Sequence, residues 1–254
     1  MQVPGAYWCE TIPELRSLLS WIYPLPKLLE LGSRAFKRYF YALTAEGGSA
    51  KALNFANYLL DAQKEHGLTM EDISGLTANL IGGGVDTTSS TMISCILGCV
   101  AFPEAQKKAQ EEIDRVVGQG RSPTLEDEPK LPYCAAFVKE TLRWRSVAIL
   151  GGLPHAPSKD DEYRGYYFPA GINITGNLWA IHRNPRDFPE PDVFKPERYL
   201  EGSRMPYPNE RGHNAFGWGR RQCSGQPLAE QGLMMYLTRF LWAFRIEPGT
   251  DDQL

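Results

Sequence analysis

The sequence lacks the features that mark several common classes of protein. Its cysteines are few and odd in number, and their spacing matches neither a disulfide framework nor a zinc site; they are Cys9, Cys95, Cys99, Cys134 and Cys223. The net charge is only −3, from 27 Lys and Arg against 30 Asp and Glu, which gives no support for nucleic-acid binding. No internal repeat or low-complexity tract is present. These absences leave an ordinary globular chain in a reducing, cytosol-facing environment.

The sequence also lacks a recognisable targeting segment. Residues Met1 to Glu10 contain no basic region and no apolar run, so we expect neither a signal peptide nor an anchor there. One apolar segment, from about Ile73 to Phe102, is long enough to span a membrane. However, Asp86 lies near its middle beside a run of Ser and Thr over residues 87–91, and an ionisable residue is costly in a bilayer. We therefore expect a core helix there.

One cysteine has unusual neighbours. Cys223 lies in the run Phe216-Gly217-Trp218-Gly219-Arg220-Arg221-Gln222-Cys223-Ser224-Gly225. Glycines permit tight turns and close approach to a flat ligand, and adjacent arginines favour a thiolate. A helix expected over Gln226–Phe244 begins just after the loop, and its dipole favours an anion. The pattern predicts a thiolate able to bind iron, although a buried free cysteine beside a glycine turn is the alternative.

This loop resembles the haem-binding signature of the cytochrome P-450 family, F-x-x-G-x-R-x-C-x-G. The matching positions are Phe216, Gly219, Arg221, Cys223 and Gly225. The resemblance implies that Cys223 is the axial ligand of haem b iron, and that Arg221 and His155 donate to the haem propionates. For His155 an ordinary loop histidine remains the other interpretation. Gln222 and Ser224 depart from the family, in which Ile or Val and Pro are commoner.

A second stretch, Gly82 to Thr88, resembles the family's oxygen-binding motif [AG]-G-x-[DE]-T. Glycine in a helix costs about 1 kcal/mol, so Gly83 and Gly84 suggest that a ligand approaches the backbone. The resemblance implies that these glycines lie against the cofactor and that Asp86 and Thr87 relay protons to bound oxygen. A core helix with a glycine defect is the alternative.

Two further motifs place three charged residues in one group. Glu140 and Arg143, in E-x-x-R spacing on a helix expected over 132–144, share one helix face. By itself this spacing is typical of a surface ion pair. The run Phe194 to Tyr199 resembles the family's P-E-R-F/W/Y segment, which implies that Arg198 joins the pair in a buried structural triad behind the haem loop.

The resemblance implies a mainly α fold with small β-sheets (α+β), namely the C-terminal portion of the cytochrome P-450 fold. We expect one partial haem domain over 1–254, with the oxygen-binding helix at 72–102 and the meander and cysteine loop at 188–225. A further helix is expected over Pro103–Val117, and a hairpin over Glu162–Thr175 with its turn at Phe168–Gly171. Complete members are roughly twice this length, which leaves a fragment, a gene-model error or a truncated paralogue as open interpretations.

The implied activity is that of a haem-thiolate monooxygenase, which inserts one atom of O2 into a lipophilic small molecule with electrons from NADPH through a flavoprotein reductase. Candidate substrate contacts are Asn79, Leu80, Val147, Ala148, Ile149 and Leu150. The alternatives are a non-catalytic remnant and a haem-thiolate isomerase or peroxide-using enzyme, although the intact Asp86–Thr87 pair disfavours the last. Short runs at 160–163 and 179–182 resemble microsomal fungal members, whose full-length forms face the cytosol at the endoplasmic reticulum.

Two surface patterns concern partners. Residues 195–221 carry six Lys and Arg against three Glu. This local excess of positive charge suits docking of an acidic electron donor. The alternative is that Arg198 and Arg221 are taken up by the triad and a propionate, which leaves only a modest basic patch. The aromatic and proline-rich run from Trp21 to Pro26 is compatible with a membrane surface and equally with packing on the domain.

Overall fold

The computed structural model describes residues 8, 12–18, 22–200 and 211–249. Its contacts divide the chain into two compact units, residues 1–86 and 87–254. The boundary falls inside the helix α5 (Met70–Ala101), which therefore contributes residues to both units.

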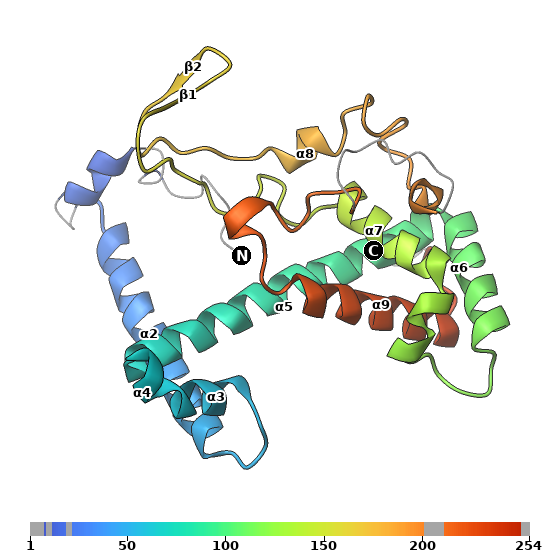
Figure 1. Ribbon diagram of the computed structural model, residues 1–254, viewed down its shortest axis with the longest axis horizontal. Coiled ribbons are helices and arrows are strands. Elements are labelled where there is room, and N and C mark those ends of the chain that lie inside the picture. The colour runs from blue at the N-terminus through green and yellow to red at the C-terminus, as the bar shows by residue number, and fades with distance from the viewer. Residues whose placement is uncertain (1–7, 9–11, 19–21, 201–210, 250–254) are drawn as a thin grey trace. The chain divides into compact units, whose positions relative to one another are not determined.

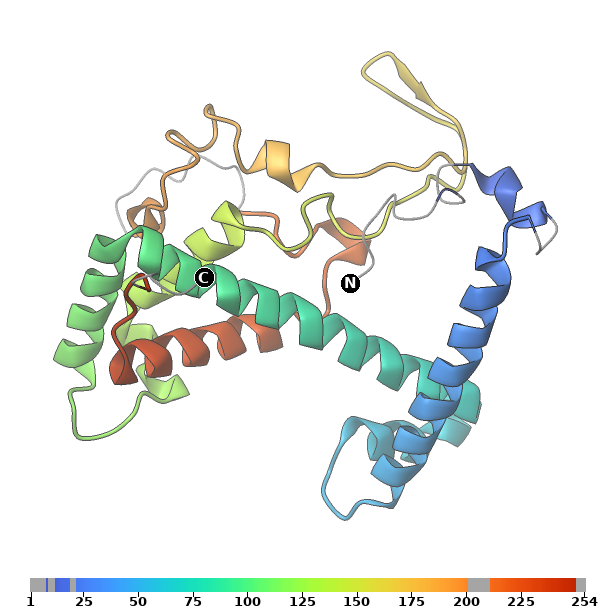
Figure 2. The ribbon, with the colours of Figure 1, turned by 180° about the vertical axis from the view of Figure 1, so that it is seen from behind.

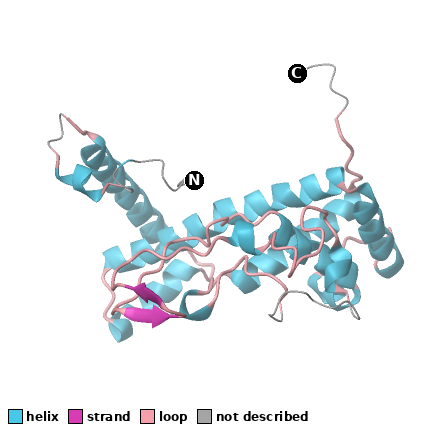
Figure 3. Ribbon diagram, turned by 90° about the horizontal axis from the view of Figure 1, so that it is seen from above, coloured by secondary structure: helices cyan, strands magenta, loops and turns pink. Residues whose placement is uncertain are grey.

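The described residues are mainly helical and include one small two-stranded sheet, which is the α+β composition that we expected (Figures 1 and 3). Besides α5, the α-helices are α2 (Leu25–Ser49), α3 (Phe55–Asp61), α4 (Gln63–His66), α6 (Pro103–Val116), α7 (Pro132–Trp144), α8 (Leu178–Ile181) and α9 (Gln226–Ala243). The 3-10 helices are η1 (Pro13–Ser17), η2 (Leu125–Lys130), η3 (Pro196–Tyr199) and η4 (Gly219–Arg221).

In the first unit, asparagine side chains join α2 to α3. Asn54 caps α3, because its Oδ1 accepts a hydrogen bond from the Asn57 amide at 3.0 Å. The side-chain amides of Asn54 and Asn57 donate to the carbonyls of Gly47 and Gly48 at 2.9 and 3.2 Å. These bonds satisfy carbonyls at the C-terminal end of α2, where a helix leaves its last acceptors unpaired.

Helix α5 begins at a cap and ends at a proline. The Asp72 amide donates to Thr69 Oγ1 at 3.1 Å, and the Thr69 amide donates to Asp72 Oδ2 at 2.8 Å. At the other end, Pro103 takes the first position of α6, where a missing N–H costs nothing. The helix therefore covers almost the range that its apolar sequence predicted.

The core of the second unit lies among α6, α7, α9 and the last turns of α5, which gather on one side of the ribbon in Figures 1 and 2. The apolar stripe predicted on α6 is buried there at Ala105, Ala109 and Ile113. Phe194 adds an aromatic cluster, with ring centroids 4.6 Å from Phe137 and 5.5 Å from Trp144. This packing fixes α7, which carries the E-x-x-R motif.

The N-terminal end of α7 is held by a carboxylate from α6. Glu112, which is buried, accepts hydrogen bonds from the backbone amides of Tyr133 at 3.0 Å and Cys134 at 2.9 Å. Both amides belong to the first turn of a helix, which has no acceptors of its own for them, and a negative charge is favourable at that end. Glu112 thereby connects the α6 core helix to the motif helix.

The hairpin differs from the sequence prediction. β1 (Asp161–Tyr163) pairs antiparallel with β2 (Tyr166–Phe168), and the two-residue turn is Arg164–Gly165. Both turn residues have positive φ, 54° and 81°, as two-residue hairpins of type I′ require. The predicted turn at Phe168–Gly171 is therefore wrong; that segment forms the next turn, in which the Ile172 amide donates to the Pro169 carbonyl at 3.2 Å.

Among the described residues, no single helix combines the length and apolarity that crossing a bilayer requires; α5 and α6 meet that requirement only when taken together across a 105° bend. In the aromatic and proline-rich run, Trp21 lies outside the described residues and Ile22 is exposed.

Replacing Glu112 tests the α6–α7 connection. We expect Glu112→Ala to lower the free energy of unfolding by about 1–3 kcal/mol, because two helix-end amides lose their buried acceptor. Urea unfolding measures the change, with Glu111→Ala as the control, since Glu111 is an exposed neighbour on the same helix. Equal unfolding midpoints for the two variants would contradict the capping role.

Candidate functional site

The cysteine loop is closed by short-range backbone hydrogen bonds. The Cys223 amide donates to the Phe216 carbonyl at 2.9 Å, and the Gln222 amide donates to the Gly219 carbonyl at 3.2 Å. At the start of the loop, the Gly217 amide donates to the Asn214 carbonyl at 2.9 Å. These bonds bring Cys223 next to the phenylalanine with which the family signature begins.

Two glycines allow this loop conformation. Gly217 and Gly219 have φ values of 72° and 63°, in the left-handed region that favours glycine over other residues. A Cβ added at either position would meet no atom within 4 Å, so the backbone there borders open space. The constraint on these positions is therefore conformational, and the face of the loop remains accessible to a ligand.

Cys223 differs from the other cysteines that the structure describes. Its thiol is exposed, whereas Cys95, Cys99 and Cys134 are buried. Burial raises the pKa of Cys95 to about 11 and that of Cys99 to about 12, so these two remain thiols. Cys223 also lies three residues before the start of α9, and its carbonyl accepts from the Gln226 amide at 3.5 Å. Among the described cysteines, Cys223 therefore has the setting that a metal-binding thiolate needs.

The E-x-x-R pair is fully buried on α7. Arg143 donates from Nε to Glu140 Oε2 at 2.7 Å and from Nη2 to Glu140 Oε1 at 2.8 Å, and neither side chain is exposed. This two-pronged geometry is the strong form of the arginine–carboxylate interaction. Because both side chains are buried, Glu140 and Arg143 do not form the exposed surface ion pair that the E-x-x-R spacing alone would suggest.

Arg198 completes the charged group. It lies on η3 and donates from Nε to Glu140 Oε1 at 3.4 Å, with only 7% of its side chain exposed. The Lys195 backbone amide also donates to Glu140 Oε1, at 2.8 Å. Glu140 thus connects α7 to the segment that begins the meander.

Arg143 is also bound to carbonyl groups far along the chain. Its Nη1 donates to the carbonyls of His182 at 2.9 Å and Pro191 at 2.8 Å. Phe188 lies under the guanidinium, 5.4 Å from ring centroid to Cζ. Sequence motifs identified the three charged side chains but not these acceptors, because a backbone carbonyl leaves no mark in a sequence.

The segment after α7 contains the four candidate pocket residues of the second unit. Val147 and Ala148 are half-buried, whereas Ile149 and Leu150 are exposed. The Ile149 carbonyl accepts from the Trp179 amide at 3.1 Å. These apolar side chains therefore lie on a short backbone segment that is hydrogen-bonded to α8.

Close backbone approach links this segment to the cysteine loop. A Cβ at Gly151 would lie 2.7 Å from the Gly176 carbonyl oxygen, and a Cβ at Gly176 would overlap the Trp218 ring. Trp218 belongs to the cysteine loop, so two glycines allow three separate segments to meet there. Sequence reasoning gave no role to Trp218, which lies inside the cysteine motif, or to Gly176, which follows the predicted hairpin.

The two expected propionate donors are both exposed, His155 in an extended segment and Arg221 on η4. His155 forms an antiparallel bridge with Ile174, with backbone N···O distances of 2.9 and 2.7 Å. No residue in this part of the chain buries either side chain, so both remain accessible to an anionic ligand.

The stretch predicted to be the oxygen-binding motif is an exposed part of α5. Gly83, Gly84 and Asp86 belong to the first unit and Thr87 begins the second. A Cβ added at Gly83 or Gly84 would meet no atom within 4 Å, so the helix surface there is open. Thr87 receives a hydrogen bond at its carbonyl from Thr91 Oγ1 at 2.9 Å. Asn79 and Leu80, the other pocket candidates, are exposed on the same helix.

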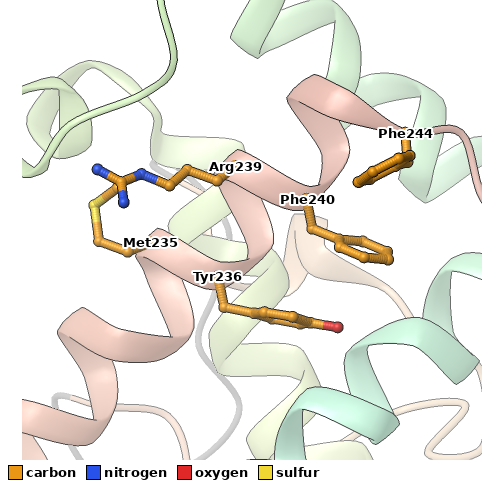
Figure 4. Close-up of a pocket in the computed structure, with 5 residues that line it drawn as sticks. All are labelled: Met235, Tyr236, Arg239, Phe240 and Phe244. Atoms are coloured by element: carbon orange, nitrogen blue, oxygen red, sulfur yellow. The ribbon is translucent and has the colours of Figure 1, made fainter.

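A separate apolar hollow of about 370 Å³ lies on the C-terminal half of α9 (Figure 4). Tyr236 and Phe240 stack there with ring centroids 5.4 Å apart, and Phe244 continues the row at 5.3 Å. Cys223 precedes the opposite end of α9, so this hollow is distinct from the cysteine loop.

The residues of the loop fit a haem-thiolate group. The thiol is exposed, the glycine backbone beside it borders open space, and Arg221 supplies an accessible cation. These are the donor types that iron and propionate require.

Removing one member of the buried triad tests its structural role. We expect Glu140→Ala to lower the free energy of unfolding by about 3–5 kcal/mol, because two guanidinium groups lose their buried counter-ion. Arg143→Lys keeps the positive charge but loses the paired hydrogen bonds of the guanidinium to Glu140, so it should also be destabilising. Urea unfolding followed by circular dichroism measures both.

Lys195→Ala is the matched control for the triad. Its backbone amide still binds Glu140, and its side chain makes only an exposed contact of 3.9 Å with Glu190, so the change should be below about 1 kcal/mol. A triad variant as stable as this control would show that the buried charges are dispensable.

Comparisons with known proteins agree with this geometry. The model of the family described as Cytochrome P450 matches residues 34–254. The chain is 36% identical to cytochrome P450 monooxygenase 58 of Postia placenta, over 98% of this chain and 49% of the relative. It is 37% identical to monooxygenase 113 of the same fungus, over 96% and 49%, and 35% identical to a cytochrome P450 monooxygenase of Armillaria gallica, over 99% and 51%.

The chain thus spans about half the length of these curated relatives. The match nevertheless covers the cysteine loop, the E-x-x-R helix and the glycine-rich stretch of α5 together. On these grounds the chain belongs to the cytochrome P450 family.

Proposed function

We propose that this chain carries the haem-binding part of a haem-thiolate monooxygenase that oxidises a lipophilic small molecule. The observation that carries the proposal is the exposed Cys223 thiol on a left-handed glycine loop, in the same unit as the buried Glu140–Arg143–Arg198 group. An exposed thiol beside arginines and before a helix suits iron ligation. The monooxygenase names of the fungal relatives support the reaction class.

When bound, haem supplies the activation of O2 that no amino-acid side chain can provide. Cys223 would hold the iron as a thiolate, and the positive end of the α9 dipole favours that charge. Arg221 and His155 would donate hydrogen bonds to the propionates. Glu140, Arg143 and Arg198 take no part in the chemistry; they hold the backbone on which the loop depends.

Asp86 and Thr87 form the proton relay of the proposed mechanism. A carboxylate next to a hydroxyl on a helix can hold a proton and pass it on to a ligand beside the helix. Gly83 and Gly84 would leave space for such a ligand, because neither carries a side chain. Val147, Ala148, Ile149 and Leu150 bind the substrate, mostly through apolar contact that excludes water.

The electron donor in this proposal is an NADPH-dependent flavoprotein reductase. Exposed cations near the cysteine loop support docking of an acidic partner, since complementary charge accelerates encounter; among them are Arg211 and Arg220. Arg204, which also contributed to the predicted local excess, lies outside the described residues. For a full-length form we propose the cytosolic face of the endoplasmic reticulum.

The absorption spectrum of the haem-reconstituted chain, reduced and exposed to carbon monoxide, tests this function. We expect a strongly red-shifted Soret band, because a thiolate ligand donates electron density to the iron. Cys223→Ser should abolish the red shift. Cys95→Ala, which alters a buried cysteine, should keep it.

An unshifted band in the unmodified chain would overturn the proposal. It would favour the alternative, a non-catalytic remnant that does not form a competent haem site. The same spectrum decides between the two.

A further inference from the structure

A histidine to which the sequence motifs assigned no role lies between the triad and the cysteine loop. His182 directly follows α8 and its side chain is completely buried, whereas His66 and His155 are exposed. A buried imidazole requires hydrogen-bond partners for both ring nitrogens. His182 has them, and each comes from a different segment of the second unit.

The hydrogen bonds of the ring define its tautomer. Nε2 lies 3.0 Å from the backbone nitrogen of Asn214, which can only donate, so Nε2 is the acceptor and carries no proton. Nδ1 therefore bears the proton and lies 2.9 Å from Ser146 Oγ. Ser146 uses its own proton to donate to the Leu142 carbonyl on α7, so its oxygen is available as the acceptor.

The backbone of the same residue contacts the triad. The His182 carbonyl accepts from Arg143 Nη1 at 2.9 Å, and the His182 amide donates to the Leu178 carbonyl at 2.9 Å. Both polar groups of the main chain and both nitrogens of the ring are thus engaged. His182 cannot shift without breaking a buried bond to α7, to α8 or to Asn214.

Asn214 is the residue from which the cysteine loop starts. Its carbonyl accepts from the Gly217 amide at 2.9 Å, and the intervening Phe216 carbonyl accepts from the Cys223 amide at 2.9 Å. A displacement of Asn214 would therefore be transmitted to the cysteine through two backbone bonds.

We propose that His182 is a positioning residue which, as a neutral imidazole protonated at Nδ1, holds Asn214 and so aligns the cysteine loop with α7. The inference rests on the proposed haem-thiolate function for its significance. It concerns a residue that acts through the backbone of Asn214 and has no hydrogen bond to the cysteine loop beyond that residue.

The electrostatic surroundings keep the ring neutral. Burial lowers the pKa of His182 to about 4, and the cations of Arg143 on α7 and of the adjacent Arg183 act in the same direction. His213, the other buried histidine nearby, has a pKa lowered to about 3, also mainly by burial. Both imidazoles are therefore uncharged above about pH 5, and Nε2 of His182 remains an acceptor for Asn214.

Two substitutions separate the contacts of the ring. His182→Gln can place its side-chain oxygen near the Nε2 position and keep an acceptor for Asn214. His182→Asn can place its side-chain nitrogen near the Nδ1 position and keep a donor for Ser146, but it loses the acceptor. His66→Gln, on α4 in the first unit, is the control for loss of a histidine elsewhere.

The first measurement is amide hydrogen exchange at Asn214, made without haem. We expect Asn214 to exchange at least about tenfold faster in His182→Asn than in the unmodified chain. The rate in His66→Gln should equal that of the unmodified chain, and the rate in His182→Gln should return most of the way to it. In the unmodified chain, ¹⁵N NMR at pH 6 should show the His182 ring protonated at Nδ1. An unchanged Asn214 rate in His182→Asn, or a ring protonated at Nε2, would overturn the inference.

The second measurement is the carbon monoxide spectrum of the same variants. His182→Asn should reduce the fraction of red-shifted Soret band at equal haem content, and His182→Gln should recover it. If the unmodified chain gives no red-shifted band, the proposed function fails, and the exchange rates still decide whether His182 positions Asn214. If exchange changes as expected and the red-shifted fraction is equal in all variants, alignment of the cysteine by His182 is refuted.

Discussion

The carboxylate of Glu140 is the group on which the arrangement of the second unit depends. It accepts four hydrogen bonds: two from Arg143, one from Arg198 and one from the Lys195 amide. Three of these bonds reach Oε1 and one reaches Oε2, so protein donors supply most of the hydrogen bonds that an ionised carboxylate can accept. The donors come from α7, from η3 and from the backbone between them, and a single buried anion therefore fixes three parts of the chain.

Burial of so many charges contributes more to geometry than to stability. Removing a carboxylate and two guanidiniums from water is expensive, and well-packed apolar side chains often replace such groups without loss of stability. Apolar side chains, however, do not distinguish one carbonyl from the next. Arg143 does, because its Nη1 is directed at the carbonyls of His182 and Pro191. The triad thus sets the register of the long irregular segment between α8 and η3, where no sheet or long helix sets it.

Local signals in the sequence predicted the helices well, and contacts between distant segments explain what they missed. Proline in the first turn marked the starts of α6 and α7, and the E-x-x-R spacing placed Glu140 and Arg143 on one face. The hairpin turn was misplaced because Arg164 adopts a positive φ, which a non-glycine residue rarely does. Glu112 as a cap for α7, and the carbonyl acceptors of Arg143, depend on tertiary placement. In the sequence, Glu112 looks like any surface glutamate, and the residues that supply the carbonyl acceptors look like any loop.

The cysteine loop must be accessible to a ligand, whereas the residues that position it must be buried. The cysteine loop must expose its thiol, so it cannot be rigidified by burying its own side chains. Its internal bonds join residues within seven positions of one another, and glycines give it further freedom. Its direction must therefore be set at its two ends. At one end buried Gln226 opens α9 and donates its amide to the Cys223 carbonyl. At the other end Asn214 is held by His182, itself anchored to Arg143. A flexible, accessible loop between two buried anchors reconciles ligand access with a fixed thiol.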